Sequence, residues 1–110
     1  MPEPRLVTHV WVGAYLRHLS LADIPAYVTA RGDATAGAVL VKLATLDGQA
    51  RAYVREWDLM ADSRRWTVLA EGPEREVDAA VTRQRSFDPD LWVIEIEDRQ
   101  GRHLLEAMDG

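Results

Sequence analysis

The chain has 110 residues, of which 47% are hydrophobic and 28% charged, and it contains no cysteine. This composition is typical of one globular domain rather than a disordered or disulfide-stapled chain, and the length excludes a TIM barrel or a complete doubly wound dinucleotide-binding fold. The 13 basic and 18 acidic side chains give a net charge of −5, which disfavours binding to a phosphate backbone because that binding needs clustered cations.

The first predicted element is a helix from Thr8 to Leu19, capped by the Thr8 side chain and ended before Asp23 and Pro25. Its apolar residues occupy most of its circumference. A helix of this kind packs into a sheet or against a partner chain, because it has too little polar surface to be solvated.

Strand-like runs follow at residues 26–30 and 37–43, separated by a turn in which Gly32 and Gly37 are expected to serve the backbone geometry. Asp47-Gly48 comes between the second run and a third one. This dipeptide between two strands predicts a hairpin with a two-residue loop. A fourth strand is predicted over residues 65–70, after the polar loop around residues 61–63.

Gly72-Pro73 opens a second predicted helix, whose acidic residues precede its basic ones, as the helix dipole favours. Asp88-Pro89-Asp90 ends this helix, and residues 91–96 then alternate as a strand. The predicted fold class is α+β: a four- or five-stranded, mainly antiparallel sheet with two helices packed on one of its faces, in the order α-β-β-β-β-α-β, as a single domain over residues 1–110.

Two segments of the chain are distinctive: RGDATAGAVLVK at residues 31–42 and FDPDLWVIEIED at residues 87–98. With these segments the chain resembles, over nearly its whole length, a family of short bacterial proteins, the domain of unknown function 1491 family. The resemblance implies a standalone bacterial domain. It supplies no catalytic residues, because the family has no assigned activity.

The predicted hairpin loop also predicts which side chains share a face of the sheet. A two-residue loop places residue 44 opposite 51, 42 opposite 53 and 40 opposite 55. One face then forms the core, with Val39, Val41, Leu43, Ala52 and Val54. The other face carries Leu40 and Lys42 beside the residues that form the candidate binding surface if Trp57 pairs with Trp66: Arg51, Tyr53, Arg55, Trp57 and Trp66.

Three uses of this candidate binding surface follow from its residue types. Trp, Tyr and Arg are enriched at the hot spots of protein interfaces, which favours a homo-oligomer or a protein partner. The same planar groups stack planar ligands or single-stranded bases. Alternatively, the first helix covers the face, the aromatic residues form a second core, and the arginines reach Glu95 or Glu97.

A second candidate site is an acidic cluster of Asp33, Asp88, Asp90, Glu95 and Glu97. Such clusters suit Mg²⁺ or Ca²⁺, and paired carboxylates can divide acid and base roles. However, Asp88-Pro89-Asp90 lacks the ligand density of a calcium loop, and alternating Ile and Glu are typical of a strand with one wet face. We therefore predict no metal and no cofactor.

No catalytic motif is found: His9, His18 and His103 are scattered, and zinc-protease, nucleophile-elbow and phosphate-loop patterns are absent from the sequence. The lack of cysteine, of a signal-peptide pattern and of a long apolar run predicts a cytoplasmic protein with no membrane partner. We predict a non-enzymatic binding or regulatory module that acts through a sheet face or a homodimer interface. The alternatives are a small enzyme or metabolite-binding domain with a pocket lined by Arg and Asp/Glu, and a protein that binds single-stranded nucleic acid.

Overall fold

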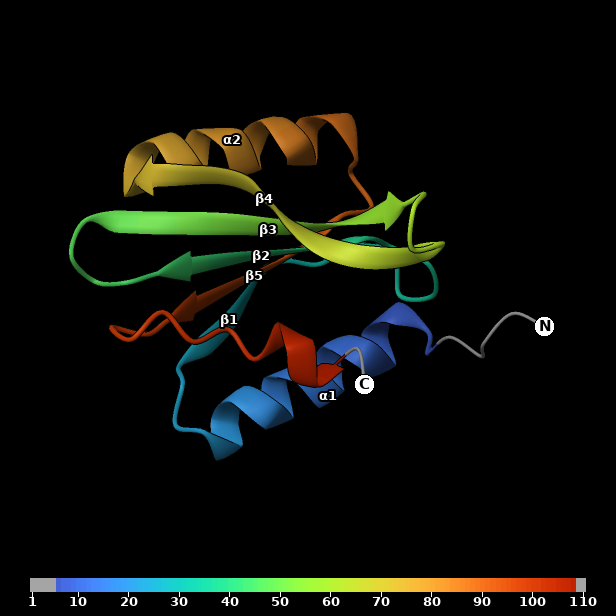
Figure 1. Ribbon diagram of the computed structural model, residues 1–110, viewed down its shortest axis with the longest axis horizontal. Coiled ribbons are helices and arrows are strands. Elements are labelled where there is room, and N and C mark those ends of the chain that lie inside the picture. The colour runs from blue at the N-terminus through green and yellow to red at the C-terminus, as the bar shows by residue number, and fades with distance from the viewer. Residues whose placement is uncertain (1–5, 109–110) are drawn as a thin grey trace.

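The computed structural model describes residues 6–108, apart from the side chain of Trp57. Within this range the elements follow the predicted order, and the α+β fold class is confirmed (Figure 1). The elements are α1 (Thr8–Leu21), β1 (Ala26–Ala30), β2 (Val39–Ala44), β3 (Gln49–Asp58), β4 (Ser63–Pro73), α2 (Glu74–Phe87), β5 (Trp92–Glu97) and the short 3-10 helix η1 (Leu105–Met108).

The five strands form one sheet in the order β1-β5-β2-β3-β4. β2 and β5 run parallel, and the other neighbouring pairs are antiparallel, so the sheet is mixed. The central strand β2 is buried on both sides, which requires a covering layer on each face of the sheet at this strand.

The two helices lie on opposite faces of the sheet, so the expectation that they share one face is wrong (Figure 1). α1 packs against Val41, Leu43 and Ile94, whereas α2 packs against Leu40 and Val93. Neighbouring residues of a strand point to opposite faces, so the apolar run in β2 needs both helices.

Each helix covers only part of its face. α2 packs on β4, β3 and β2, whereas α1 lies over β1, β5 and β2 and contacts Trp66 of β4 through its Trp11 side chain. Two diagonally opposite parts of the sheet therefore lie largely outside the cover of a helix: the β3–β4 half on the α1 side and the β1–β5 half on the α2 side.

The β2–β3 hairpin has a three-residue loop, which corrects the predicted register by one residue. Leu46 and Gly48 adopt positive φ angles of 63° and 88°, and Asp47 accepts hydrogen bonds from the Thr45 hydroxyl and the Gln49 amide. Val41 consequently faces Tyr53, and Lys42 faces Ala52. A shift of one residue exchanges the faces of the two strands relative to each other.

The predicted cap of α1 is also corrected. Val7 occupies the N-cap position without a side-chain cap, and Thr8 is the first helical residue. The Thr8 hydroxyl instead donates a hydrogen bond of 2.7 Å to the carbonyl of Gly37, which ties the start of α1 to the loop before β2.

None of the helices within residues 6–108 is long and apolar enough to cross a membrane.

Candidate binding face on the α1 side of the sheet

Four of the five predicted binding residues have described side chains, and all four lie on the α1 side of the sheet. Arg51, Tyr53 and Arg55 alternate along β3, and Trp66 lies opposite Arg55 on β4. The predicted pairing of Trp57 with Trp66 is wrong, because Trp57 pairs with Arg64. The side chain of Trp57 lies outside the described part of the structure.

An aromatic cluster joins α1 to β3 and β4. The ring centroids of Trp11 and Trp66 lie 5.7 Å apart, and the Arg55 guanidinium carbon lies 5.8 Å and 5.3 Å from them respectively. These distances are those of cation–π contacts, which stabilise a stacked arginine. The first helix thus covers one side of Trp66, as one of the alternative interpretations of the sequence expected.

The indole donors of this cluster lack an acceptor within the described part of the chain. The indole N–H groups of Trp11 and Trp66 are buried and form no hydrogen bond within residues 6–108. A buried donor without an acceptor costs about 1–3 kcal/mol. An acceptor group supplied from outside this part of the chain would recover that energy.

The C-terminal segment covers Tyr53. His103 packs on the Tyr53 ring with a centroid distance of 4.7 Å, and its carbonyl accepts a 2.7 Å hydrogen bond from the buried Tyr15 hydroxyl. Arg102 donates hydrogen bonds to Asp98, which hold the pKa of that carboxyl below its usual range and fix the turn before His103.

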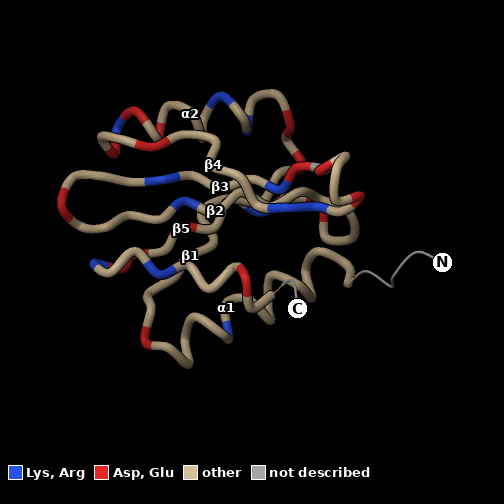
Figure 2. Tube along the Cα trace, in the orientation of Figure 1, with Lys and Arg blue, Asp and Glu red and all other residues tan. Residues whose placement is uncertain are grey.

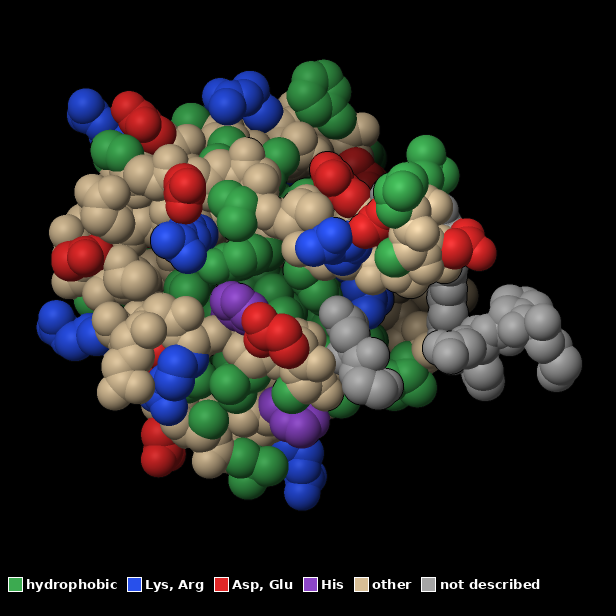
Figure 3. Space-filling model, in the orientation of Figure 1, with side chains coloured by type: hydrophobic (Ala, Val, Ile, Leu, Met, Phe, Trp, Pro, Cys, Tyr) green, Lys and Arg blue, Asp and Glu red, His purple; other side chains and the backbone are tan. Residues whose placement is uncertain are grey.

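Beyond Tyr53 the face is open. The side chains of Arg51 and Glu71 are 58% and 59% exposed and lie 3.0 Å apart, and Val68 is 48% exposed between them and Trp66. A hydrogen bond with Tyr53, followed by the charges of Tyr53 and Glu71, raises the pKa of Arg51. Figure 3 shows hydrophobic side chains in a hollow in the middle of this view, with a histidine beside them.

A cavity of about 580 Å³ adjoins the open end of this face. It lies between the β2–β3 loop, the end of β4 and the turn at residues 99–101. Its charged lining residues are Asp47, Arg51, Glu71 and Arg99. Both signs of charge therefore border one cavity.

The predicted acidic cluster is divided in the structure. Asp33 and Asp88 accept backbone hydrogen bonds in turns, and the Asp90 carbonyl accepts one from the Asp33 amide. Glu95 lies on the α2 side of the sheet, and Glu97 follows two residues later on the same strand. The arginines of β3 therefore do not reach Glu95, and Arg51 pairs with Glu71 instead.

Sequence reasoning missed a cluster around the only lysine. Lys42 is 4% exposed, and its ammonium lies 2.7 Å from Glu74, 2.6 Å from Asp78 and 3.2 Å from Glu95. Burial works against the charged form, but the hydrogen bonds to Asp78 and Glu74 and the charge of Glu95 outweigh it and raise the pKa of Lys42. The signal in the sequence is a single charge inside the apolar run of residues 39–43.

Within residues 6–108 no three His, Asp or Glu side chains are placed so that they could hold a metal ion. Figure 2 shows basic and acidic positions interspersed along the strands and helices of the described chain rather than gathered in one basic stripe. The electrostatic footprint of a protein that binds nucleic acid is such a stripe.

The fold and this face define a small α+β domain whose mixed sheet presents one half-open surface of arginine and aromatic residues. The family model described as "Protein of unknown function (DUF1491)" matches residues 6–106, and the chain belongs to this family. The resemblance seen in the sequence is confirmed.

Solved structures agree with this assignment. A crystal structure of a DUF1491 family protein from Caulobacter crescentus CB15 is 41% identical, with 91% of this chain and 92% of that chain covered and a TM-score of 0.81. An NMR structure of a DUF1491 family protein from the same organism is 40% identical, with 94% of each chain covered and a TM-score of 0.81. A solution structure of a protein from A. tumefaciens is 32% identical, with 86% of each chain covered and a TM-score of 0.72. The search of curated proteins gives no match.

Proposed function

We propose that this protein is a non-enzymatic, cytoplasmic binding module that pairs with a second copy of itself through the open β3–β4 half of the α1 side. Of the predicted binding residues, the proposed surface contains Arg51, Arg55, Trp66 and the β3 position of Trp57, and it also contains Val68 and Glu71. The buried Tyr53 lies beneath it. The observation that carries this proposal is the exposed pair Arg51 and Glu71, which borders the exposed Val68.

This pair makes the surface complementary to itself. A two-fold axis brings the same patch of both copies together, so that residue i meets residue j and j meets i. Arg51 of one copy then faces Glu71 of the other, while the two Val68 side chains are buried near the axis. Opposite charges around an apolar centre are the usual arrangement of a specific interface.

The aromatic cluster supports the same surface. Trp66 and Arg55 form its base, and these residue types supply most binding energy in measured interfaces.

A charge-swap cycle tests this proposal. Arg51→Glu places like charges across the two-fold axis, so we expect the dimer dissociation constant to rise at least about tenfold in sedimentation equilibrium. The double variant Arg51→Glu with Glu71→Arg restores opposite charges and should return the constant to near the wild-type value.

Arg83→Glu is the matched control, because Arg83 is an exposed arginine on α2, on the other side of the sheet. It should leave association unchanged. Equal weakening by Arg83→Glu and Arg51→Glu, or a double variant no better than Arg51→Glu alone, would contradict the pairing of these two residues.

The cavity of about 580 Å³ favours a second candidate function, a metabolite-binding domain. Its lining of Arg51, Arg99, Asp47 and Glu71 would suit a small ligand that carries both signs of charge. This function predicts that a zwitterionic metabolite raises the melting temperature and that Arg99→Gln removes the rise. A panel of such metabolites with no thermal shift would exclude it.

A further inference from the structure

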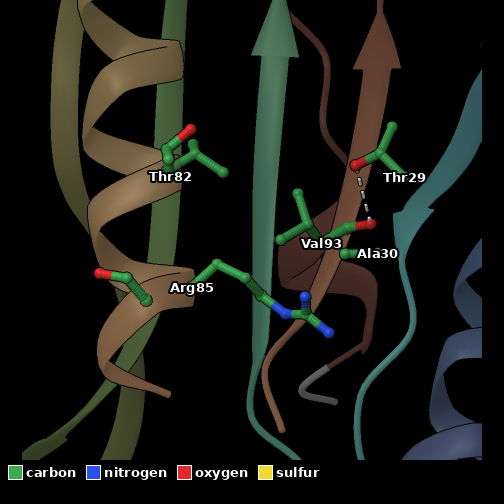
Figure 4. A pocket seen from close by; sticks show the side chains of 7 residues that line it. Thr29, Ala30, Thr82, Arg85 and Val93 are labelled. Atoms are coloured by element: carbon green, nitrogen blue, oxygen red, sulfur yellow. Dashed lines mark hydrogen bonds between the residues drawn. The ribbon is translucent and has the colours of Figure 1, made fainter. Parts of the chain in front are cut away.

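The other open part of the sheet, the β1–β5 half on the α2 side, holds a second cavity. Its volume is about 330 Å³, within the range of small-molecule sites. Its apolar lining, called the floor below, consists of Ala30, Val81 and Val93, and its polar lining consists of Thr29, Thr82, Arg85 and Ser86. Figure 4 shows that the labelled side chains come from β1, α2 and β5.

Arg85 is held across this cavity by two backbone carbonyls. Its Nε donates to the Leu91 carbonyl at 2.8 Å, and its Nη2 donates to the Arg31 carbonyl at 2.7 Å. Both bonds use the same edge of the planar guanidinium. The end edge, with one N–H from each terminal nitrogen, is left in the geometry that binds a carboxylate in a bidentate manner.

The positive charge of Arg85 has no protein counter-ion in residues 6–108, because no described carboxylate forms an ion pair with it. The residue is also partly buried. A fixed, partly buried guanidinium without a counter-ion favours the binding of an external anion.

A β-bulge places a threonine on the lining of the same cavity. Val28 pairs with Ile94 and Ala30 with Val93, so Thr29 is the extra residue of β1. Bulges re-aim side chains and recur next to functional sites. The hydroxyls of Thr29, Thr82 and Ser86 each donate to a backbone carbonyl, which leaves their oxygens as acceptors for a ligand donor.

We propose that this cavity binds a small monocarboxylic acid with a short apolar side chain and a hydroxyl or amino donor near the carboxylate. The end edge of Arg85 holds the carboxylate, the apolar floor holds the side chain, and a threonine oxygen accepts from the donor group. A monocarboxylate is favoured over a phosphate because the site has a single guanidinium fork and the whole chain carries a net charge of −5.

The test is an NMR titration of the full chain with three probes of matched shape: α-hydroxyisovalerate, isovalerate and isovaleramide. We expect the hydroxy acid to shift the Arg85 Nε–H and the amides of Thr29 and Thr82 in a saturable manner. Isovalerate should bind more weakly because it lacks the hydroxyl, and isovaleramide should not bind because it lacks the charge. Inorganic phosphate that shifts the same signals with equal affinity would overturn the assignment to a carboxylate.

Variants separate the site from general charge effects. Arg85→Gln should raise the dissociation constant of α-hydroxyisovalerate at least about tenfold, whereas Arg83→Gln, two residues away and exposed on the same helix, should not change it. Thr82→Phe fills the cavity without removing the bonds of Arg85, and it should also abolish binding. Binding that survives Thr82→Phe, or the absence of saturable shifts with every acid, would refute the site, and neither result bears on self-association.

Discussion

Gly32 shows how one residue fixes the loop between β1 and β2. A Cβ atom at this position would collide with the carbonyl of Asp90 and with the Trp92 ring, so only glycine allows the loop to pack on the start of β5. We expect Gly32→Ala to lower the free energy of unfolding by about 1–3 kcal/mol, as overpacking does, measured by urea denaturation.

Gly13→Ala is the matched control for this substitution. A Cβ at Gly13, inside α1, meets no atom within 4 Å, so alanine should stabilise the protein by about 0.5–1 kcal/mol through its helix propensity. If both substitutions moved the urea midpoint in the same direction, the close packing of Gly32 would not be the cause.

The buried Tyr15 makes the stability of the protein fall at alkaline pH. Burial, followed by the charges of Tyr53 and Glu106, raises the pKa of its phenol above the ordinary value. The phenol of the unfolded chain therefore ionises first, so the stability that the buried neutral phenol contributes is complete below about pH 10 and is lost as the pH rises further.

Tyr15→Phe is expected to separate this effect from the hydrogen bond to His103. At neutral pH the variant should be about 1–3 kcal/mol less stable, because the His103 carbonyl loses its buried donor. Above about pH 10 its stability should fall less steeply than that of the wild type, by up to about 1.4 kcal/mol per pH unit. Urea denaturation at a series of pH values measures this dependence, and Tyr27→Phe is the control because Tyr27 is exposed. If the free energy of unfolding fell equally steeply above about pH 10 for Tyr15→Phe and the wild type, the expectation would be contradicted.

Lys42 joins α2 to the sheet through ion pairs. It lies on β2 and contacts Glu74 and Asp78 of α2 and Glu95 of β5. Lys42→Met leaves these carboxylates without their cation, and because they are partly exposed we expect a loss of about 2 kcal/mol, less than for a fully buried pair. Adding Glu95→Gln, the least exposed of the three, should recover part of the loss in urea denaturation. No recovery would mean that Glu95 contributes no repulsion.

The elements themselves were largely predictable from local signals. Gly72-Pro73 predicts the start of α2 and Asp88-Pro89-Asp90 predicts its end, because the backbone angles that these residues favour begin and end helices. α2 runs from Glu74 to Phe87, between these two segments. The strand order and the parallel pairing of β2 with β5 could not be derived in this way, because those pairings join segments far apart in the chain.

The candidate face depended on one loop residue. Leu46 takes a left-handed conformation that costs energy for a side chain of its type, so local propensity favoured the shorter loop. Arg51, Tyr53 and Arg55 still point to one side of the sheet, because they lie two residues apart on β3. Their neighbours on β2 are Leu43 and Val41 rather than Lys42. Lys42 therefore lies on the opposite side of the sheet, beside its carboxylate partners.

For the whole molecule, the diagonal placement of the two helices determines where ligands or partners can approach. Each face of the sheet is half covered, so one open half lies beside α1 and the other beside α2. The first carries the surface proposed for self-association, and the second carries the cavity beside Arg85. Because the two lie on opposite faces, a dimer formed through the first would leave the second accessible.

The most direct test of self-association is the solution mass by light scattering across a dilution series, for the wild type beside the double variant Arg55→Ala with Trp66→Ala. We predict that the wild type reaches twice the mass of the chain at high concentration and falls to the mass of one chain on dilution. The double variant should have the mass of one chain throughout, because it removes the base of the proposed surface. A wild type with the mass of one chain at every concentration would contradict the proposal.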